Sequence, residues 1–289
     1  MQRSIEVERF KKAHGYDLNL DEPKTYNEKI CHSKLFNRNP LLTLTTDKYR
    51  ARQYIREKVG EDCEEHFVPL YFVFDSASFV PYITFPSKYV IKPNHSSGKL
   101  IIKDDDYTVG MGKAKYQASN LSALELIVEA WLKEDYSIAW NEWAYKDIEP
   151  LIVIEELITD SNGNLPTDYR LSMFDGKLGL VSVTTPYQET FNYFDKDLKP
   201  VSINVKPELK DFKLPKLFDK ALELAEKISK GWNFIRCDFF ITDKVYFSEL
   251  THYPGAGNSH YPYDFDLQLG ELWRNNGSRR TDTSNTSRD

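Results

Sequence analysis

The sequence predicts an α+β fold, because helical and β-rich segments mix along the chain without the regular alternation of βαβ units. Apolar residues recur at helical spacing through residues 46–60 and again through 214–230. β-Branched and aromatic residues, separated by turn residues, dominate 168–183 and 236–251, which is typical of antiparallel hairpins. No internal repeat interrupts this arrangement.

The expected elements follow from these periodicities and from the turn residues between them. We expect Thr46 to cap the helix that follows it and Gly60 to end that helix. The polar residues 275–289 are expected to form a disordered tail. The remaining helices are expected at 26–35, 122–133, 214–230 and 266–273, and strands at 68–74, 89–92, 99–103, 151–154, 168–174 and 178–183.

Composition places the chain among ordinary soluble proteins. It has 289 residues, 40% of them hydrophobic and 28% charged, which suits one large or two medium domains. A net charge of −6 gives no electrostatic case for binding nucleic acid. Cys31, Cys63 and Cys237 lie far apart, without the spacing of a disulfide framework or a zinc site. The first residues lack the apolar core of a signal peptide, and no segment approaches a membrane span, so we expect a cytoplasmic protein.

The segment 236–251 predicts two carboxylates facing each other across a hairpin. A two-residue loop at Asp243 and Lys244 would set the register of the two strands so that Asp238 lies directly opposite Glu249. Like charges in directly opposed positions destabilise a sheet, so such a pair is typical of a site for a hard cation such as Mg²⁺. A solvated hairpin with two surface acids is the alternative. The residues placed on one face by this register are Arg236, Asp238, Phe240, Phe247, Glu249 and Thr251.

A second polar cluster follows the strand that ends at Lys92. The next loop contains Ser96, Ser97 and Gly98. A lysine at a strand end, beside a loop of small hydroxyl residues, can hold phosphate through its charge and through backbone amides. The sequence has neither a Walker A loop nor a Rossmann loop here, and a surface turn with a solvated lysine is the alternative.

These clusters, taken in chain order, resemble the ATP-grasp superfamily, and within it the TupA-like branch of teichuronopeptide and capsular polysaccharide synthesis. The resemblance covers residues 16–273. Asp47-Lys48 with Arg52 is similar to the helix that enters the ATP-grasp core, where a basic residue meets the nucleotide phosphates. Lys92 and the loop of Ser96, Ser97 and Gly98 are similar to the family's phosphate lysine and lid.

The resemblance also implies a nucleotide-binding hinge in residues 154–158. Glu155 would lie beside the adenine amino group, and the backbones of Glu156 and Ile158 would read the ring edge. Asp168 fits the acid that binds the ribose hydroxyls. Arg170, two residues later, would meet the γ-phosphate or the substrate carboxylate.

The hairpin resembles the metal-binding hairpin of the family, with Asp238 and Glu249 as Mg²⁺ ligands. The third ligand is usually Asn, where this chain has Thr251, a weaker ligand. Arg236 would stabilise the negative charge that develops during the reaction. His252 follows the metal strand and would contact phosphate or relay a proton.

The same resemblance implies a domain plan. Residues 1–45 would form a reduced N-terminal region and 46–274 the ATP-grasp core. Within that core, 86–158 would form the lid subdomain and 159–274 the metal-binding subdomain.

The function implied is an ADP-forming ligase that uses ATP and Mg²⁺ to activate a carboxylate as an acyl phosphate and to couple it to an amine. The branch implies a uronic acid of a surface polysaccharide or its precursor as the carboxylate, and an amino acid or other amine as the nucleophile. Eighteen tyrosines are compatible with a sugar ligand. The alternatives are an ATP-dependent sugar kinase, a glycosyltransferase and a non-catalytic nucleotide-binding module.

Overall fold

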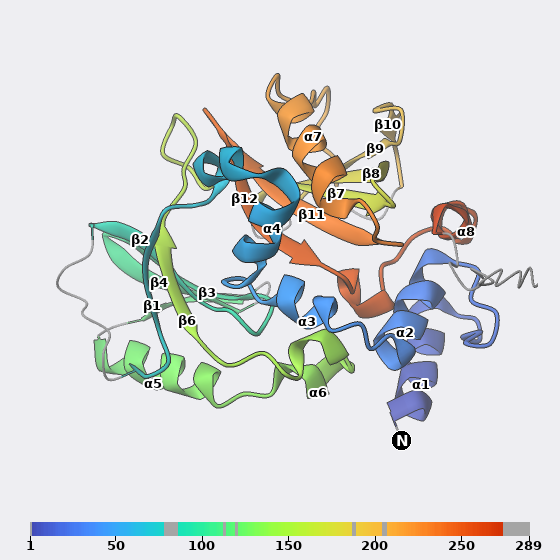
Figure 1. Cartoon of the computed structure of the whole chain (residues 1–289), viewed down its shortest axis with the longest axis horizontal. Coiled ribbons are helices and arrows are strands. Elements are labelled where there is room, and N and C mark those ends of the chain that lie inside the picture. The colour runs from blue at the N-terminus through green and yellow to red at the C-terminus, as the bar shows by residue number, and fades with distance from the viewer. Residues whose placement is uncertain are drawn as a thin grey trace, which may run out of the picture.

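The computed structural model describes residues 2–77, 86–111, 114–118, 121–186, 189–203 and 207–273. The chain forms two six-stranded antiparallel sheets, and helices α3 (Leu41–Thr46) and α4 (Ala51–Val59) lie near the centre of the view in Figure 1. The predicted α+β fold is confirmed. The expected tail at 275–289 lies outside the described residues.

The first sheet has the strand order β1-β6-β2-β3-β4-β5. Helix α5 (Leu121–Leu132) covers one face, where its Leu124 and Val128 join Ile91 and Ile154 in one apolar core. This burial of β-branched and leucine side chains stabilises the sheet. Its strands are β1 (Leu70–Phe74), β2 (Lys88–Pro93), β3 (Lys99–Asp104), β4 (Asp106–Met111), β5 (Ala114–Ala118) and β6 (Ile152–Glu156).

The second sheet has the order β10-β9-β8-β7-β11-β12. Helix α7 (Phe218–Ser229) packs on it through an apolar stripe that includes Phe218, Ala221 and Ile228, as the helical periodicity predicts. Its strands are β7 (Asp168–Phe174), β8 (Lys177–Thr184), β9 (Phe191–Asp195), β10 (Pro200–Val201), β11 (Ile235–Ile241) and β12 (Val245–Thr251).

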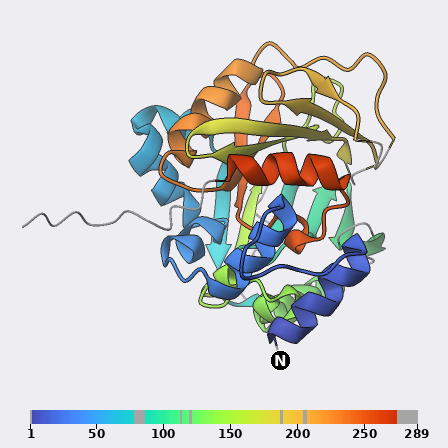
Figure 2. The same cartoon turned by 90° about the vertical axis from the view of Figure 1, so that its right-hand side faces the viewer.

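Helices near the N-terminus pack against the C-terminal segment (Figure 2). Helix α2 (Tyr26–Phe36) begins with a capping box, in which Thr25 and Glu28 satisfy each other's backbone N–H groups. The side chain of Asn27 in α2 donates to Asp266 of α8 at 2.9 Å. The other short helices are α1 (Gln2–His14), η1 (Glu61–His66), α6 (Tyr136–Trp140), η3 (Trp143–Tyr145), η5 (Pro254–Gly257) and α8 (Tyr263–Leu272).

The helix expected at 46–60 is shorter than predicted. It begins at Ala51, because Asp47 holds the preceding turn by accepting from the backbone N–H groups of Tyr49 and Arg50. The prediction of Thr46 as the cap is therefore wrong, since Thr46 ends α3. Gly60 ends the helix as predicted, with a φ of 95° that favours glycine.

The hairpin of β11 and β12 has the predicted pairing at its open end and a different loop. Asp238 pairs with Glu249 as expected. The loop has three residues instead of two, and Ile241 pairs with Val245. A β-bulge at Ser248 offsets the longer loop and restores the register at the acids. Phe247 consequently pairs with Phe239, and the prediction that it shares a face with Phe240 is wrong.

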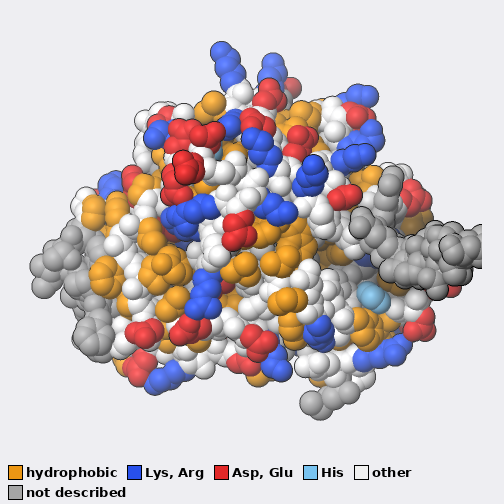
Figure 3. All heavy atoms as spheres, in the orientation of Figure 1, with side chains coloured by type: hydrophobic (Ala, Val, Ile, Leu, Met, Phe, Trp, Pro, Cys, Tyr) orange, Lys and Arg blue, Asp and Glu red, His pale blue; other side chains and the backbone are white. Residues whose placement is uncertain are grey.

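The predicted subdomain boundary at residue 86 omits one strand of the first sheet, because β1 pairs with β6. Residues before 46 share the core of the second sheet through Tyr26, Ile30 and Leu42. No helix within the described part of the chain combines the length and apolarity that a membrane crossing requires. On the face drawn in Figure 3, basic and acidic side chains are interspersed.

Candidate active site

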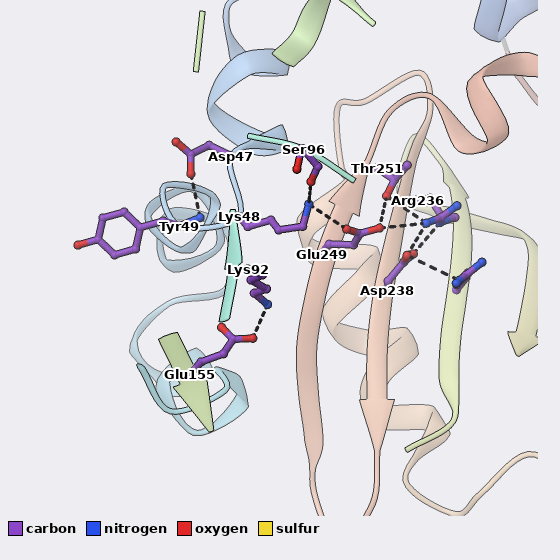
Figure 4. A network of polar contacts seen from close by, with 11 residues as sticks. Asp47, Lys48, Tyr49, Lys92, Ser96, Glu155, Arg236, Asp238, Glu249 and Thr251 are labelled. Atoms are coloured by element: carbon purple, nitrogen blue, oxygen red, sulfur yellow. Dashed lines mark hydrogen bonds and ion pairs between the residues drawn. The ribbon is translucent and has the colours of Figure 1, made fainter. Parts of the chain in front are cut away.

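The two acids of the hairpin lie in a network with Arg236 (Figure 4). Arg236 Nε donates to Asp238 Oδ1 at 2.7 Å, and one of its terminal nitrogens donates to Thr251 Oγ1 at 3.1 Å. Thr251 in turn donates to Glu249 Oε1 at 3.1 Å. The four polar residues among the six that sequence analysis placed on one face of the hairpin therefore belong to one network.

The neighbouring strand β7 adds an acid and a cation to this network. Arg170 pairs in register with Asp238, and its Nε lies 4.0 Å from the Asp238 carboxylate. Arg170 also donates to Asp168 Oδ2 at 2.7 Å. The other oxygen, Asp168 Oδ1, is buried without a hydrogen-bond partner among the described residues. Asp168 thus lies at the acid pair, and its role in binding ribose stays a prediction.

Lys48 connects the hairpin to the loop after β2, and the sequence analysis did not select it. Its Nζ donates to the carbonyl oxygen of Ser96 at 2.7 Å and lies 3.4 Å from Glu249 (Figure 4). Lys48, Arg170 and Arg236 together offset Asp168, Asp238 and Glu249. Lys48 directly follows Asp47, the residue that fixes the turn. This position in the sequence could have indicated Lys48 as a site residue.

The surroundings move the pKa values of the two hairpin acids in opposite directions. Burial raises the pKa of Asp238, whose side chain is 1% exposed, while Arg236 opposes that shift. Burial also opposes ionisation of Glu249, but Lys48 and Arg236 prevail and lower its pKa to about 2. Glu249 is therefore ionised at neutral pH and can contribute a full negative charge to the site.

Lys92 and Arg52 meet at Glu155, at the end of the first sheet. Lys92 Nζ contacts Glu155 Oε1, and an Arg52 terminal nitrogen lies 3.5 Å from Glu155 Oε2. Arg52 also donates to the carbonyl oxygen of Val68 at 2.8 Å. The structure brings these three predicted residues together. Arg52 lies beside Glu155, whereas Lys48 is the cation that lies beside Glu249.

The loop after β2 is fixed mainly by Asn94 and lines a cavity. Asn94 Oδ1 accepts from the backbone N–H of Leu151 at 2.8 Å. Ser96 is buried, and its hydroxyl has no partner among the described residues. Ser97 and Gly98 line the cavity, and Gly98 has a φ of 72°. The predicted phosphate loop thus presents small residues to open space.

At the predicted hinge, the backbone offers fewer groups than expected. The N–H of Glu156 donates to the carbonyl oxygen of Pro69 at 2.9 Å, so that N–H is not available to a base edge. The N–H of Ile158 has no partner among the described residues. Of the Glu156 backbone, the carbonyl group is therefore the part that could meet a base edge, and the roles of Glu156 and Ile158 in binding adenine stay predictions.

A cavity of about 780 Å³ opens beside the hairpin. Arg170, Arg236, Glu249 and Thr251 line one wall, so the polar network faces this space. Its volume falls within the range of small-molecule sites. Phenol rings also line the cavity, from Tyr26, Tyr136, Tyr145, Tyr193, Tyr253 and Tyr261.

His252 lies at the edge of this cavity, but its side chain has a structural environment. Its Nε2 is 2.7 Å from Thr45 Oγ1, and its ring lies 4.7 Å from that of Trp232. Burial lowers the pKa of His252 to about 3. A neutral, hydrogen-bonded imidazole in this position does not relay protons near neutral pH, so the geometry does not support the predicted catalytic role.

This burial gives a testable pH dependence of stability. Below the ordinary histidine pKa of 6.5 the unfolded chain takes up a proton that the folded chain refuses, so stability falls as pH falls. We expect wild type to lose about 2 kcal/mol more than His252→Gln between about pH 7 and about pH 5. Urea unfolding of both proteins at the two pH values measures the difference. Equal losses would contradict the assignment of a buried neutral histidine.

The residues of the hairpin suit Mg²⁺ in kind and number. No group of three or more His, Cys, Asp and Glu side chains with metal-binding geometry occurs in the described ranges. Two carboxylates are nevertheless sufficient for Mg²⁺, which usually takes one or two from the protein and the rest from phosphate and water. Asp238 and Glu249 face each other in register, with Thr251 beside them. The ion would be held there and would neutralise phosphate charge.

Comparison with known protein families identifies the chain. The model of the family described as TupA-like ATPgrasp matches residues 28–274. The chain belongs to the TupA-like ATP-grasp family. Its two antiparallel sheets and their helices are accordingly those of an ATP-grasp fold, as the resemblance of the sequence implied.

Solved structures that resemble this TupA-like protein are distant. An L-amino acid ligase from Bacillus licheniformis is 14% identical over 85% of this chain and 54% of its own, with a TM-score of 0.46. A D-alanine–D-alanine ligase from Bacillus anthracis, complexed with ATP, is 14% identical over 81% and 65%, with a TM-score of 0.42. The corresponding ligase from Helicobacter pylori is 16% identical over 79% and 57%, with a TM-score of 0.41.

The TupA-like chain thus spans between 54% and 65% of the length of these three structures. TM-scores below 0.5 do not support an inference about function from these structures. A comparison with curated proteins gave no match. The activity of the chain must therefore be argued from its own residues.

Proposed function

We propose that this TupA-like ATP-grasp protein is an ADP-forming ligase that joins a carboxylate to an amine. The observation that carries the proposal is the facing pair of Asp238 and Glu249, set in a network of cations at the wall of a cavity. Phosphoryl transfer requires mainly positioning and neutralisation of charge, and this arrangement provides both. Membership of the ATP-grasp family supports the use of ATP.

The two ends of the network have separable tasks under this proposal. Glu155, with Lys92 and Arg52 around it, and the N–H of Ile158 form the nucleotide-binding end. Asp238 and Glu249 hold Mg²⁺, which supplies charge neutralisation at the transferred phosphate. Lys48 lies between the ends and contacts both the loop and Glu249.

The cavity is the place for the two remaining substrates. Arg170 and Arg236 line it and can bind the carboxylate that is activated. Phenol rings that also line the cavity suit the apolar faces and hydroxyl groups of a sugar. These features support a uronic acid, free or within a polysaccharide precursor, as the carboxylate, and an amino acid or other amine as the nucleophile.

A product-resolved screen tests the proposal. The purified protein is incubated with Mg²⁺ and ATP, a panel of uronic acids and oligosaccharides that contain them, and the twenty common amino acids. We expect ADP release that requires both a carboxylate and an amine, and an amide product by mass spectrometry. ADP release with a phosphorylated sugar and no need for amine would instead indicate a kinase. Consumption of a nucleotide sugar without ADP release would indicate a glycosyltransferase.

A separate measurement detects the first step alone. With ATP labelled with ¹⁸O in the β,γ-bridge, reversible transfer of the γ-phosphate to a carboxylate scrambles the label without any amine. We expect carboxylate-dependent scrambling by wild type. Absence of scrambling and of ADP release with every substrate, while ATP still binds, would indicate a non-catalytic nucleotide-binding module.

A further inference from the structure

A second acid, which forms no ion pair among the described residues, lines the cavity. Glu142 occupies the turn between α6 and η3 and lines the cavity. The residue is only 6% exposed. Its backbone N–H donates to the carbonyl oxygen of Ser137 at 3.1 Å, which closes the turn. The preceding Asn141 has the left-handed φ of 57° that such a turn requires.

A buried ion pair fixes this turn from behind. Lys34 Nζ donates to the carbonyl oxygen of Trp140 at 3.1 Å, and Asn141 Nδ2 donates to Glu6 Oε2, also at 3.1 Å. Lys34 and Glu6 form an ion pair with both side chains fully buried. Because the residues directly before Glu142 are held on both sides, the position of its backbone is well defined.

The carboxyl group of Glu142 makes no hydrogen bond and no ion pair among the residues that the structure describes. A buried acid without such a partner is costly, and it is typical of a group reserved for a ligand. Among the described residues, one other acid lines the cavity, Glu249, and it already contacts Lys48, Arg236 and Thr251. Glu142 is therefore the acid in this cavity that is free to meet a cation.

We propose that Glu142 binds the ammonium group of the amine substrate and accepts one proton from it. This inference rests on the proposed ligase function, because that reaction requires an amine in the cavity. Amines are protonated in neutral solution and cannot attack until a proton is removed. The aromatic ring of Tyr136, which also lines the cavity, suits a cationic group.

The proton balance is complete without another reactant. Glu142 takes one proton from the ammonium group and leaves a neutral amine. The nitrogen lone pair forms the C–N bond at the activated carbonyl, and the C–O bond to phosphate breaks with its electron pair on the phosphate oxygen. The surplus proton on nitrogen leaves with the phosphate. Glu142 then returns its proton to solvent or to the departing phosphate.

The electrostatic environment supports this role. Burial raises the pKa of Glu142 to about 8, and the nearby charges have mixed effects: Lys34 and Lys48 lower it, whereas Glu6 and Glu249 raise it. The phenols of Tyr136, Tyr145 and Tyr253 also lie within its electrostatic reach. A carboxylate with a raised pKa is a better proton acceptor than an ordinary glutamate.

The test compares cationic and neutral nucleophiles on Glu142→Gln. With the amino acids that wild type accepts in the screen, we expect the KM for the amine to rise by about 10- to 100-fold, because the substitution removes a charge-assisted hydrogen bond. Hydroxylamine is largely uncharged at neutral pH, so hydroxamate formation is expected to change less than threefold. Label scrambling with carboxylate alone is also expected to persist, because the first step does not involve Glu142.

The pH profile adds a readout that a purely structural role would not change. We expect the amine affinity of wild type to increase between about pH 7 and about pH 9, as Glu142 ionises, and that of Glu142→Gln to show no such increase. Glu142→Asp should keep part of the effect. Glu223→Gln, on the exposed face of α7, is the matched control and should behave as wild type. Thermal unfolding confirms that each variant is folded.

The outcomes separate this inference from the function on which it rests. If wild type neither scrambles label nor releases ADP with any carboxylate, the ligase proposal fails. If wild type is active and folded Glu142→Gln has an unchanged KM and pH profile for the amine, the ligase stands and the role of Glu142 is wrong. Equal losses with amino acids and hydroxylamine would also overturn it, as would a wild type that uses only uncharged nucleophiles.

Discussion

Asp238→Asn and Glu249→Gln are each expected to lower amine-dependent ADP release by at least about 100-fold, because each removes one of the two carboxylates that face each other on the hairpin. The physical reason is electrostatic: Mg²⁺ binds anionic oxygen, and a neutral amide in its place is a weak ligand. The rate measured over a titration of Mg²⁺ shows whether the loss comes from weaker ion binding.

The two substitutions should differ in their effect on stability. Asp238 is 1% exposed and neutralises Arg236, so its replacement leaves a partly buried guanidinium without its main partner. Glu249 is 25% exposed, and Lys48 can turn toward solvent when the charge is lost. Asp243→Asn, in the exposed loop of the same hairpin, is the matched control. ATP turnover that persists in folded Glu249→Gln would show that the metal assignment is wrong.

Lys34→Met is expected to lower the free energy of unfolding by about 3–5 kcal/mol, because it leaves the fully buried Glu6 without its cation. Lys34 also donates to the carbonyl oxygen of Ala256 at 2.6 Å, so the substitution removes a link between α2 and the loop after β12. Chemical denaturation at neutral pH measures the change.

A double variant isolates the cause. Glu6→Gln combined with Lys34→Met removes both charges, and we expect it to recover a large part of the lost stability. Lys11→Met, which breaks the exposed pair of Lys11 with Asp17, should have no measurable effect. If the double variant were as unstable as Lys34→Met alone, packing and not the unpaired charge would explain the loss.

Local pattern in the sequence was sufficient to predict most elements of the core. The apolar stripe of α7 and the alternation in β7, β8, β11 and β12 require only the geometry of one segment. The edge strand β10, its neighbour β9 and the helix α1 were not expected, since such short or polar segments are determined by their neighbours in space.

The register of the acids shows the limit of such reasoning. The pairing of Asp238 with Glu249 was predicted for a two-residue loop, and the actual loop is longer. A bulge at Ser248 compensates for the extra residue, and nothing in the local pattern of β12 indicates it. The correct pairing therefore followed from two deviations that cancel, which the ladder with β7 helps to fix.

By itself, the sequence determined the family and the residue types of the facing acids, because those depend on chemistry that each short motif carries alone. The tertiary structure decided which charges meet. It placed Lys48 beside Glu249, turned Arg52 toward Glu155, and buried His252 against Trp232. It also placed Glu142 in the wall of the same cavity as Glu249. Such contacts join residues far apart in the chain, and only the packing of both sheets and their helices fixes those distances.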